Sequence, residues 1–271
     1  MASSKSTVLI TGCSDGGIGS ALAAVFQQRG YHVFATARDP SKLSSLKDLP
    51  NVTLLKLEVT SAADIHAAAE AVSKQTGGTL DYLISNAGRN HFTPILDDDV
   101  AKAREIFDIN IFGPMVLAQT FAPLLMRAKG MLAFITSIAG YMNTPYMGTY
   151  SASKRALEVI AETMRLELKP FGVDVLSVVT GAVKSQGQTY FGDFALPENS
   201  LRARGGDGLQ RMDTMEYANA VADEVVKRTT GRFWYGQNAD MVRMSTTAVN
   251  VPQEAMDAGM IMGTGLDKLN K

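Results

Sequence analysis

The chain contains three side chains whose types and spacing suit proton transfer to a carbonyl oxygen. Tyr150 and Lys154 are four residues apart within Gly148 to Phe171, where apolar spacing predicts a helix, so both project from one face. A fixed ammonium lowers the pKa of a nearby phenol from its usual value of about 10, toward the range of a general acid or base. Ser137, thirteen residues before Tyr150, would hold the carbonyl oxygen that Tyr150 protonates. Taken alone, such a pair is more often a half-buried tyrosine beside a solvated lysine, so the interpretation depends on the rest of the chain.

A glycine-rich turn near the amino terminus is typical of a nucleotide-binding site. Thr7 to Thr11 is a short apolar run that predicts a strand, and apolar residues recur at helical spacing from Ile18 to Arg29. Between them, Gly12 lets the chain reverse, Gly17 lets the backbone approach a pyrophosphate, and Gly19 lets the helix pack on the strand. The amino terminus of the helix then points at the phosphates. A plain glycine loop is the alternative, but the position after the first strand favours a nucleotide site.

The next predicted strand, Tyr31 to Thr36, leads to the residue that reads the adenosine ribose. An acidic side chain there binds the free 2′-hydroxyl of NADH, whereas an arginine suits the 2′-phosphate of NADPH. This chain has Ala37-Arg38 and no acid until Asp39. We therefore expect NADPH / NADP+ as the cofactor. The alternatives are that Arg38 is a surface arginine and that Asp39 reaches the ribose.

Predicted strands and helices alternate along the rest of the chain, which indicates a parallel sheet with helices on both faces and right-handed crossovers. The further segments are Val52 to Val59, Ala62 to Lys74, Leu80 to Ser85, Val100 to Ala128, Met131 to Ser137, the Tyr150 helix, and Val173 to Val179. We expect an α/β fold of the Rossmann type, a doubly wound parallel sheet in a single domain. The candidate site residues lie at strand ends, where such folds bind ligands.

Composition limits the classes of partner. With 271 residues, 46% of them hydrophobic, and a formal net charge of −1, the chain can bury a large core and has no general attraction to nucleic acid or anionic membranes. Cys13 is the only cysteine, which excludes an intrachain disulfide and a thiolate metal site, and His32, His66 and His91 lack metal-ligand spacing. Met1 to Ser6 lacks the apolar core of a signal peptide, and no apolar run approaches the length of a spanning helix. We expect a cytoplasmic protein without stable membrane insertion, whose partners are small molecules and copies of itself.

Together these motifs are similar in order and spacing to those of the short-chain dehydrogenase/reductase family, over about Thr7 to Tyr235. They are Thr11-Gly12…Gly17-Ile18-Gly19, Asn86-Ala87-Gly88, Asn110, Ser137, Tyr150-x-x-x-Lys154 and Gly181-x-Val183. Each motif is weak by itself, whereas the complete ordered set is highly specific.

The resemblance implies a catalytic tetrad and hydride transfer from a nicotinamide. Asn110 would anchor a water in a proton relay, and Ser137 would orient the substrate carbonyl. Tyr150 would be the general acid or base, while Lys154 holds the nicotinamide ribose and lowers the tyrosine pKa. The implied cofactor-binding residues are Gly12, Ser14, Gly17, Ile18, Gly19, Arg38, Glu58, Val59, Asn86, Gly88, Tyr150, Lys154, Val183 and Ser185.

Each implied role has a structural alternative. Asn110 could repair a helix interrupted by Gly113-Pro114, because asparagine bonds readily to free backbone groups. Ser137 could be an ordinary strand-end serine, and Asn86 a turn residue. The resemblance also implies a homodimer or homotetramer through the helices predicted at Val100 to Ala128 and Gly148 to Phe171, with a monomer as the alternative.

The chain departs from the family pattern at several positions near the cofactor. The glycine turn is one residue longer than the common Thr-Gly-x-x-x-Gly-x-Gly, and Glu58 stands where an aspartate usually contacts adenine. Ser85 replaces an asparagine, Thr180 a proline and Ser185 a threonine. None of these changes removes a catalytic group.

The lengthened turn and Phe233-Trp234-Tyr235-Gly236-x-Asn238-Ala239 resemble fungal reductases related to NADPH-dependent acyl-dihydroxyacetone-phosphate reductases. Members of that subgroup tend to end in a Trp/Leu-rich tail that associates with lipid. Here Val251 to Lys271 is polar and has no tryptophan, which predicts a soluble relative that acts on another ketone, such as a specialised metabolite.

Three segments complete the predicted organisation: a cofactor-binding and catalytic core over residues 7–183, a substrate lid over 184–214 and a carboxyl-terminal extension over 215–271. The lid is rich in aromatic residues and glycine, which suits a mobile cover over an apolar substrate, although a disordered surface loop is the alternative.

The leading hypothesis is an NADPH-dependent ketoreductase for an apolar small-molecule ketone, with Tyr150 as the proton donor. A lipid or steroid-type ketone, including acyl-dihydroxyacetone phosphate, is the alternative substrate. A non-catalytic NADPH-binding sensor would be expected to have a damaged tetrad, and here the tetrad is intact. An isomerase or dehydratase on the same fold would differ only in its products.

Overall fold

The sheet of this protein is seven-stranded, and its strand order reverses beside the first strand. The computed structural model describes residues 5–185 and 210–246. The order is β3-β2-β1-β4-β5-β6-β7, and every neighbouring pair is parallel. Strands β2 and β3 are therefore added on one side of β1, and β4 to β7 are added in order on the other side. The point of reversal, between β1 and β4, is where doubly wound folds bind ligands.

The strands are short and mostly buried on both faces, as parallel strands between helices must be. Their bounds are β1 Thr7–Ile10, β2 His32–Ala37, β3 Val52–Lys56, β4 Tyr82–Ser85, β5 Met131–Ile135, β6 Asp174–Thr180 and β7 Gly231–Tyr235.

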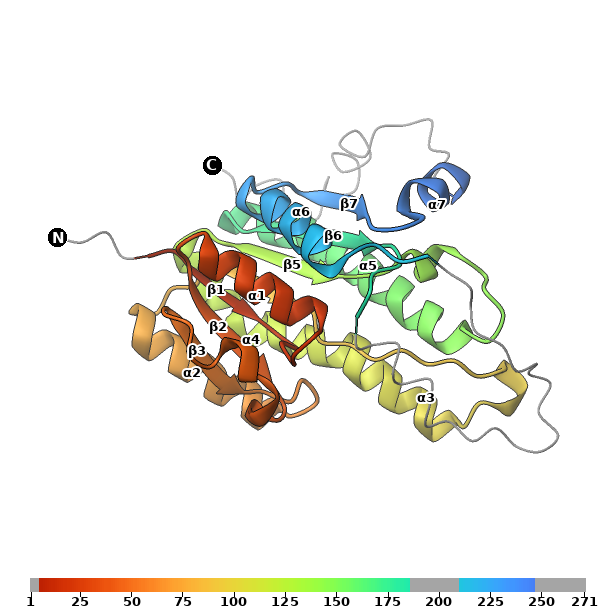
Figure 1. The fold of residues 1–271 in the computed structure, drawn as a ribbon, viewed down its shortest axis with the longest axis horizontal. Coiled ribbons are helices and arrows are strands. Elements are labelled where there is room, and N and C mark those ends of the chain that lie inside the picture. Colours follow the sequence, from red (N-terminus) through yellow and green to blue (C-terminus); the bar gives the residue numbers. More distant parts are fainter. Residues whose placement is uncertain (1–4, 186–209, 247–271) are drawn as a thin grey trace.

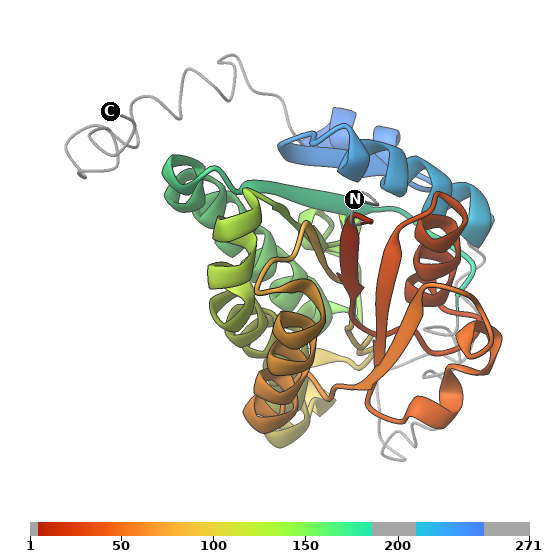
Figure 2. The same cartoon turned by 90° about the vertical axis from the view of Figure 1, so that its left-hand side faces the viewer.

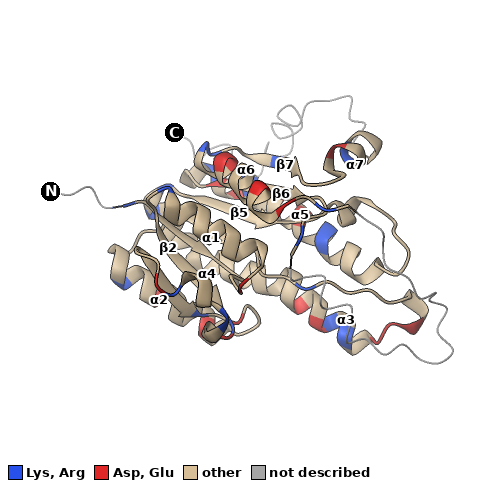
Figure 3. Cartoon of the chain, in the orientation of Figure 1, with Lys and Arg blue, Asp and Glu red and all other residues tan. Residues whose placement is uncertain are grey.

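Helices cover both faces of the sheet (Figures 1 and 2). Helices α1 (Ile18–Gln28) and α6 (Thr214–Val226) lie on one face, and α2 (Ala62–Thr76), α4 (Gly113–Ala128) and α5 (Gly148–Leu168) lie on the other. The remaining helices are α3 (Val100–Phe107) and α7 (Ala239–Thr246). Charges of both signs are interspersed on the outer helices (Figure 3), in keeping with the net charge of −1.

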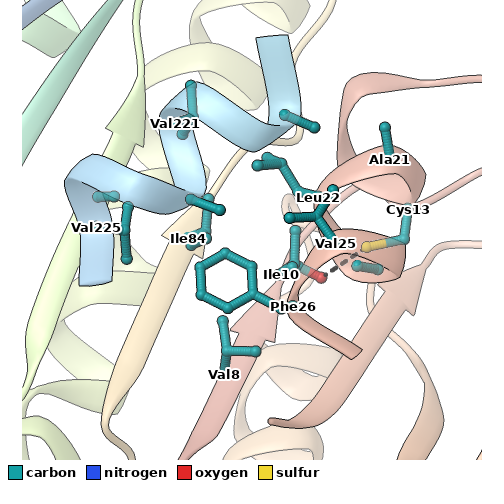
Figure 4. Close-up of a cluster of buried hydrophobic side chains, with 14 of the residues drawn as sticks. Val8, Ile10, Cys13, Ala21, Leu22, Val25, Phe26, Ile84, Val221 and Val225 are labelled. Carbon is teal, nitrogen blue, oxygen red and sulfur yellow. Dashed lines mark hydrogen bonds between the residues drawn. The ribbon is translucent and has the colours of Figure 1, made fainter. Parts of the chain in front are cut away.

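One of the two main hydrophobic clusters fixes α1 and α6 against β1 and β4 (Figure 4). Phe26 of α1 is fully buried there between Ile10 and Val225 side chains. Cys13 belongs to this cluster, and its thiol donates to the carbonyl of Ile10 at 3.2 Å. Burial raises the pKa of Cys13 to about 12, with the hydrogen bond from the Thr36 backbone acting against it, so the thiol is a core group. Cys13 therefore helps to pack α1 against the sheet.

The structure confirms the predicted fold class and shortens some predicted elements. β3 ends at Lys56 and β5 at Ile135, short of the predicted ends at Val59 and Ser137. Residues 57–59 and 136–137 therefore lie outside the strands, at the carboxyl edge of the sheet. Helix α5 gives way to a 3-10 turn at Lys169–Phe171, where Pro170 disfavours a continued helix.

The carboxyl-terminal part of the chain adds elements that the sequence analysis did not predict. α6 packs beside α1, and β7 pairs with β6 and extends the sheet. The described part of the predicted extension therefore belongs to the same sheet and core. The predicted lid falls largely on residues 186–209, and the tail on 247–271, which lie outside the described residues.

The predicted helical region Val100 to Ala128 is confirmed, with a wide turn inside it. Between α3 and α4 the backbone forms a π-helical turn at Asp108–Phe112. Pro114 explains the change, because it has no N–H to donate to the carbonyl of Asn110 four residues earlier.

Within the described residues, Val100–Ala128 is also long and apolar enough to cross a membrane, which corrects the expectation that no stretch approaches that length. Half of its most apolar window is buried inside the protein, and soluble core helices meet the same criterion.

Candidate active site

The site lies at the carboxyl ends of β1, β4, β5 and β6, where the predicted residues are brought together. Thr11 continues from β1, Asn86 from β4, Ser137 follows β5, and Gly181 follows β6. The first turn of α5 brings Tyr150 to this edge, and the π-turn brings Asn110.

Tyr150 and Ser137 are in direct contact. The hydroxyl of Ser137 hydrogen-bonds to the phenol oxygen of Tyr150, and the Tyr150 side chain is buried. Burial raises the pKa of Tyr150 above its usual value, and the Ser137 hydrogen bond acts in the opposite direction. The net lowering of this pKa expected from Lys154 is not seen, because desolvation by burial dominates and the ammonium lies 6.0 Å from the ring centroid. At neutral pH the phenol keeps its proton, as a proton donor must.

Lys154 is buried, like Tyr150. Its ammonium donates to the carbonyl of Ile135, the last residue of β5, at 2.9 Å. Burial lowers the pKa of Lys154 to about 8. An ammonium has three donors, so Lys154 can bind ribose hydroxyls or water while this bond stays in place.

Asn110 links the segment after β4 to the catalytic helix. Its amide oxygen accepts from the backbone N–H of Arg89 at 2.8 Å, and its amide nitrogen donates to the Arg89 carbonyl at 2.9 Å and to Ser153 Oγ at 3.0 Å. Ser153 in turn donates to the carbonyl of Tyr150 at 2.7 Å. These bonds leave its own helix, which argues against a helix-repair role.

Asn110 and Lys154 are neighbours across Gly88. A Cβ placed on Gly88 would lie 3.2 Å from the amide oxygen of Asn110 and 3.3 Å from the ammonium of Lys154. Residue 88 therefore has to be a glycine, without a side chain, for Asn110 and Lys154 to lie this close to the backbone.

The glycine turn and Asn86 join the two strands at the point of reversal. The amide of Asn86 donates to the carbonyls of Thr11 at 2.8 Å and Gly12 at 3.1 Å. Gly12 has a φ of 72°, which only glycine adopts without strain. A Cβ on Gly19 would lie 2.3 Å from the carbonyl oxygen of Gly12, so the predicted close packing of helix on strand is present.

The amino terminus of α1 fits a pyrophosphate. Gly17 is the N-cap residue of the helix and provides no side-chain cap, and the first turn contains no acidic residue. Helices α2 and α6 differ, because Ser61 and Asp213 cap them and each has an acidic residue in its first turn. The backbone N–H groups of α1 and the positive end of its dipole are thus available to an anion.

At the adenosine end, Arg38 is exposed and Asp39 is engaged locally. The side chain of Arg38 is 61% exposed, and its guanidinium lies 4.0 Å from the carboxylate of Glu58. The carboxylate of Asp39 accepts from the backbone N–H and the hydroxyl of Ser41, at 3.0 and 2.7 Å, and caps the following turn. This engagement favours Arg38 over Asp39 as the residue that reads the ribose.

The segment after β6 lies at the same carboxyl edge of the sheet. A Cβ on Gly181 would lie 2.4 Å from the carbonyl oxygen of Gln237, so this position is closely packed. Thr180, where the family pattern has proline, hydrogen-bonds to the hydroxyl of Tyr217 on α6 at 2.6 Å. Val183 is buried and Ser185 is partly buried beyond it.

The structure also brings together three residues that the sequence analysis did not select. The imidazole of His91 lies 2.6 Å from one carboxylate oxygen of Asp98, and Thr149, next to Tyr150, donates its hydroxyl to the other. Both His91 and Asp98 side chains are about nine-tenths buried, at 10% and 7% exposure. No motif marks this bridge, because its members are far apart in sequence; their positions flanking Asn86-Ala87-Gly88 and Tyr150 are the only signal.

Comparison with known proteins agrees with this geometry. The family model described as short chain dehydrogenase matches residues 6–194. A short-chain dehydrogenase, PC-15, of Penicillium crustosum is 47% identical over 245 residues, covering 87% of this chain and 90% of that protein. An NADPH-dependent 1-acyldihydroxyacetone phosphate reductase of Schizosaccharomyces pombe is 37% identical over 240 residues, covering 84% and 80%.

Solved structures share the fold at lower identity. A short-chain dehydrogenase from Streptomyces avermitilis has a TM-score of 0.77 at 24% identity and covers 99% of this chain and 98% of its own. One from Burkholderia cenocepacia, in complex with NADP, has a TM-score of 0.74 at 24% identity and covers 95% and 98%. With the family model matched over most of its sheet and the motifs assembled at one crevice, this chain belongs to the short-chain dehydrogenase family and is an oxidoreductase.

Proposed function

We propose that the protein is an NADPH-dependent ketoreductase that reduces the carbonyl of an apolar small molecule. The contact between Ser137 and a buried, protonated Tyr150 supports this most strongly, because it presents two hydroxyl groups side by side to one oxygen atom. A specialised metabolite is the proposed substrate class, in line with the polar sequence of Val251 to Lys271.

The cofactor proposal rests on the crevice and on the relatives. Gly12, Gly17 and Gly19 with the uncapped α1 would hold the pyrophosphate, and Arg38 would meet the 2′-phosphate. The yeast relative and the bacterial structure are themselves named with NADPH and NADP. When bound, NADPH supplies the hydride for the reduction.

The chain's own groups then handle the proton. Ser137 donates to the substrate oxygen and orients it, and Tyr150 Oη gives its proton to that oxygen as negative charge develops there. The Lys154 ammonium stabilises the tyrosinate that remains. A water at Asn110 would return a proton to Tyr150 through Lys154.

A wild-type assay tests the proposal. Purified protein would be mixed with NADPH or NADH and with carbonyl compounds from acyl-dihydroxyacetone phosphate to bulky aromatic ketones, and cofactor oxidation followed together with product identity. We expect alcohol formation with NADPH on an apolar ketone. NADPH that binds tightly without turnover on any carbonyl would favour the sensor, and a product without net reduction would favour an isomerase or dehydratase.

Acyl-dihydroxyacetone phosphate is the second candidate, because a relative at 37% identity is named for its reduction. We also propose a cytoplasmic homodimer or homotetramer that associates through the helical region Val100–Ala128 and α5. The apolar side chains of Phe112 and Val159 on these helices are each 53% exposed, which supports this surface.

A further inference from the structure

The glycine turn is one residue longer than the family pattern, and its tip is a tight turn. The backbone N–H of Gly17 donates to the carbonyl of Ser14 at 3.1 Å, and Gly16 has a φ of 73°. A positive φ at the third residue, without one at the second, is what a type II turn requires. Asp15 is the second residue of this turn.

Asp15 bridges from this turn to the segment that follows β2. Its carboxylate accepts from Ser44, from the backbone N–H at 3.0 Å and the hydroxyl at 2.6 Å, and from Ser45 in the same way at 3.0 and 2.5 Å. The backbone N–H of Asp15 also donates to the carbonyl of Lys42 at 2.8 Å. We call these contacts of Asp15 with Lys42, Ser44 and Ser45 the Asp15 clamp.

The clamp fixes one end of the segment whose other end is β2. Arg38 follows β2 directly, and the turn Pro40–Lys42 leads to the serines that Asp15 holds. The segment between these two fixed points contains the cations Arg38 and Lys42, at the side of the crevice where the adenosine ribose is expected.

The charge of Asp15 makes this position informative. Burial acts to raise its pKa but is outweighed by the hydrogen bonds from Ser44 and Ser45, which hold the pKa at about 2, so the carboxylate stays ionised. A negative charge near a phosphate site opposes phosphate binding by Coulomb repulsion, so its presence there calls for a structural role that offsets this cost. The clamp supplies that role.

We propose that Asp15 is a positioning residue that holds the Arg38–Lys42 segment in place for the 2′-phosphate of NADPH and so favours NADPH over NADH. The inference rests on the proposed use of NADPH. It assigns a function to the lengthened glycine turn, which the catalytic proposal leaves unexplained.

Cofactor affinity tests the clamp without any turnover. Dissociation constants for NADPH and NADH would be measured by fluorescence titration for wild type, Asp15→Ala, the double variant Ser44→Ala with Ser45→Ala, and Asp48→Ala. We expect Asp15→Ala to bind NADPH about tenfold more weakly and to change NADH binding less than about twofold, since NADH lacks the phosphate. The serine double variant should lose less NADPH affinity than Asp15→Ala, because the backbone N–H groups of Ser44 and Ser45 still donate to Asp15. Asp48, exposed in the same connection between β2 and β3, controls for removal of one negative charge and should show no loss of NADPH affinity.

The outcomes separate the alternatives. Tighter NADPH binding by Asp15→Ala would mean that Asp15 acts only by charge repulsion, and equal losses for both cofactors would mean that the clamp supports the whole pocket; either overturns the proposal. If Asp15→Ala does not fold, the affinities of the serine double variant for NADPH and NADH test the proposal instead, because this variant leaves the glycine turn intact. A wild type that does not prefer NADPH would refute the cofactor proposal itself, whereas a preference that survives in both variants would refute only the role of Asp15.

Discussion

Lys154 is buried, although a lysine in a Tyr-x-x-x-Lys pair on a helix is more often solvated. Burial raises the pKa of its partner Tyr150, and burial also lowers the pKa of Lys154 to about 8. The raised pKa of Tyr150 and the lowered pKa of Lys154 have the same effect, since each favours the neutral form of its side chain. A protonated phenol is ready to donate, but the ammonium that stabilises the product tyrosinate is present only below its pKa.

This predicts a descending alkaline limb in the rate of carbonyl reduction. Since Lys154 is charged below about pH 8 and loses its proton as pH rises through that value, kcat should fall across that range. The measurement is kcat with saturating cofactor and substrate from about pH 6 to about pH 10. Lys154→Met should be slow throughout and lack this limb. A wild-type rate that stays constant to the upper limit would contradict the assignment.

At the scale of elements, the site depends on contacts that join α5 to its neighbours. Asn110 and Ser153 connect α5 to the π-turn, and Asp98 connects its first turn to the loop after β4. On the far side, Glu158 of α5 faces Arg232 of β7 at 3.2 Å with its carboxylate buried. The position of Tyr150 is therefore set by several elements rather than by α5 alone.

Asp98→Ala should lower kcat/KM by about tenfold and the free energy of unfolding by about 1–3 kcal/mol, because His91 and Thr149 each lose a buried partner. Steady-state kinetics and thermal unfolding would be compared with Asp99→Ala. Asp99 has the same charge and only caps α3 through Ala101, so its loss should cost about 1 kcal/mol of stability without a change in turnover. Equal kinetic losses in both variants would rule out the bridge as the cause.

Glu158 should make stability depend on pH. Burial raises its pKa from 4.5 to about 8, with the charge of Arg232 opposing and that of Glu162 adding to the rise. The pKa of Glu158 is higher in the folded state than in the unfolded state. The contribution of its protonated carboxyl group to the free energy of unfolding is therefore complete below about pH 4.5 and is lost as pH rises to about 8. Glu158→Gln should therefore raise the free energy of unfolding at pH 8 by on the order of 1 kcal/mol or more and leave it unchanged near pH 4.

Denaturant unfolding at both pH values would measure this effect. Glu162→Gln is the matched control one turn along α5, where the carboxylate is less buried, with 15% side-chain exposure against 1% for Glu158. The burial argument fails if the two variants gain equally, or if Glu158→Gln is destabilised at pH 8.

At the scale of the whole molecule, the sequence predicts the fold class well, because alternating apolar runs and helical spacing report on burial directly. It also predicts that several candidate residues gather at the carboxyl edge of the sheet, because strand ends in a parallel sheet share one edge. It does not predict the raised pKa of Tyr150, which depends on complete burial in three dimensions. Nor does it predict the His91–Asp98–Thr149 bridge, whose members are separated by up to 58 residues, or β7, whose strand is only partly buried.

The assembly proposed for the whole molecule is also testable. Val159→Glu places a charge in the middle of the outer face of α5 and should convert the wild-type oligomer to monomers in light scattering coupled to gel filtration. Val226→Glu, at the end of α6 and 38% exposed, is the control and should leave the mass unchanged. A monomeric wild type, or an oligomer that survives Val159→Glu, would show that this face is not the interface.

The proton-donor role of Tyr150 is the central claim, and one variant tests it directly. Tyr150→Phe removes a single oxygen from a buried side chain and leaves the glycine turn and Arg38 in place. Its NADPH affinity and its rate of NADPH oxidation would be measured beside wild type on a ketone that wild type reduces. We predict unchanged affinity and a rate lower by about 10²–10⁴-fold, the usual contribution of a positioned acid. A rate equal to that of wild type would contradict the account.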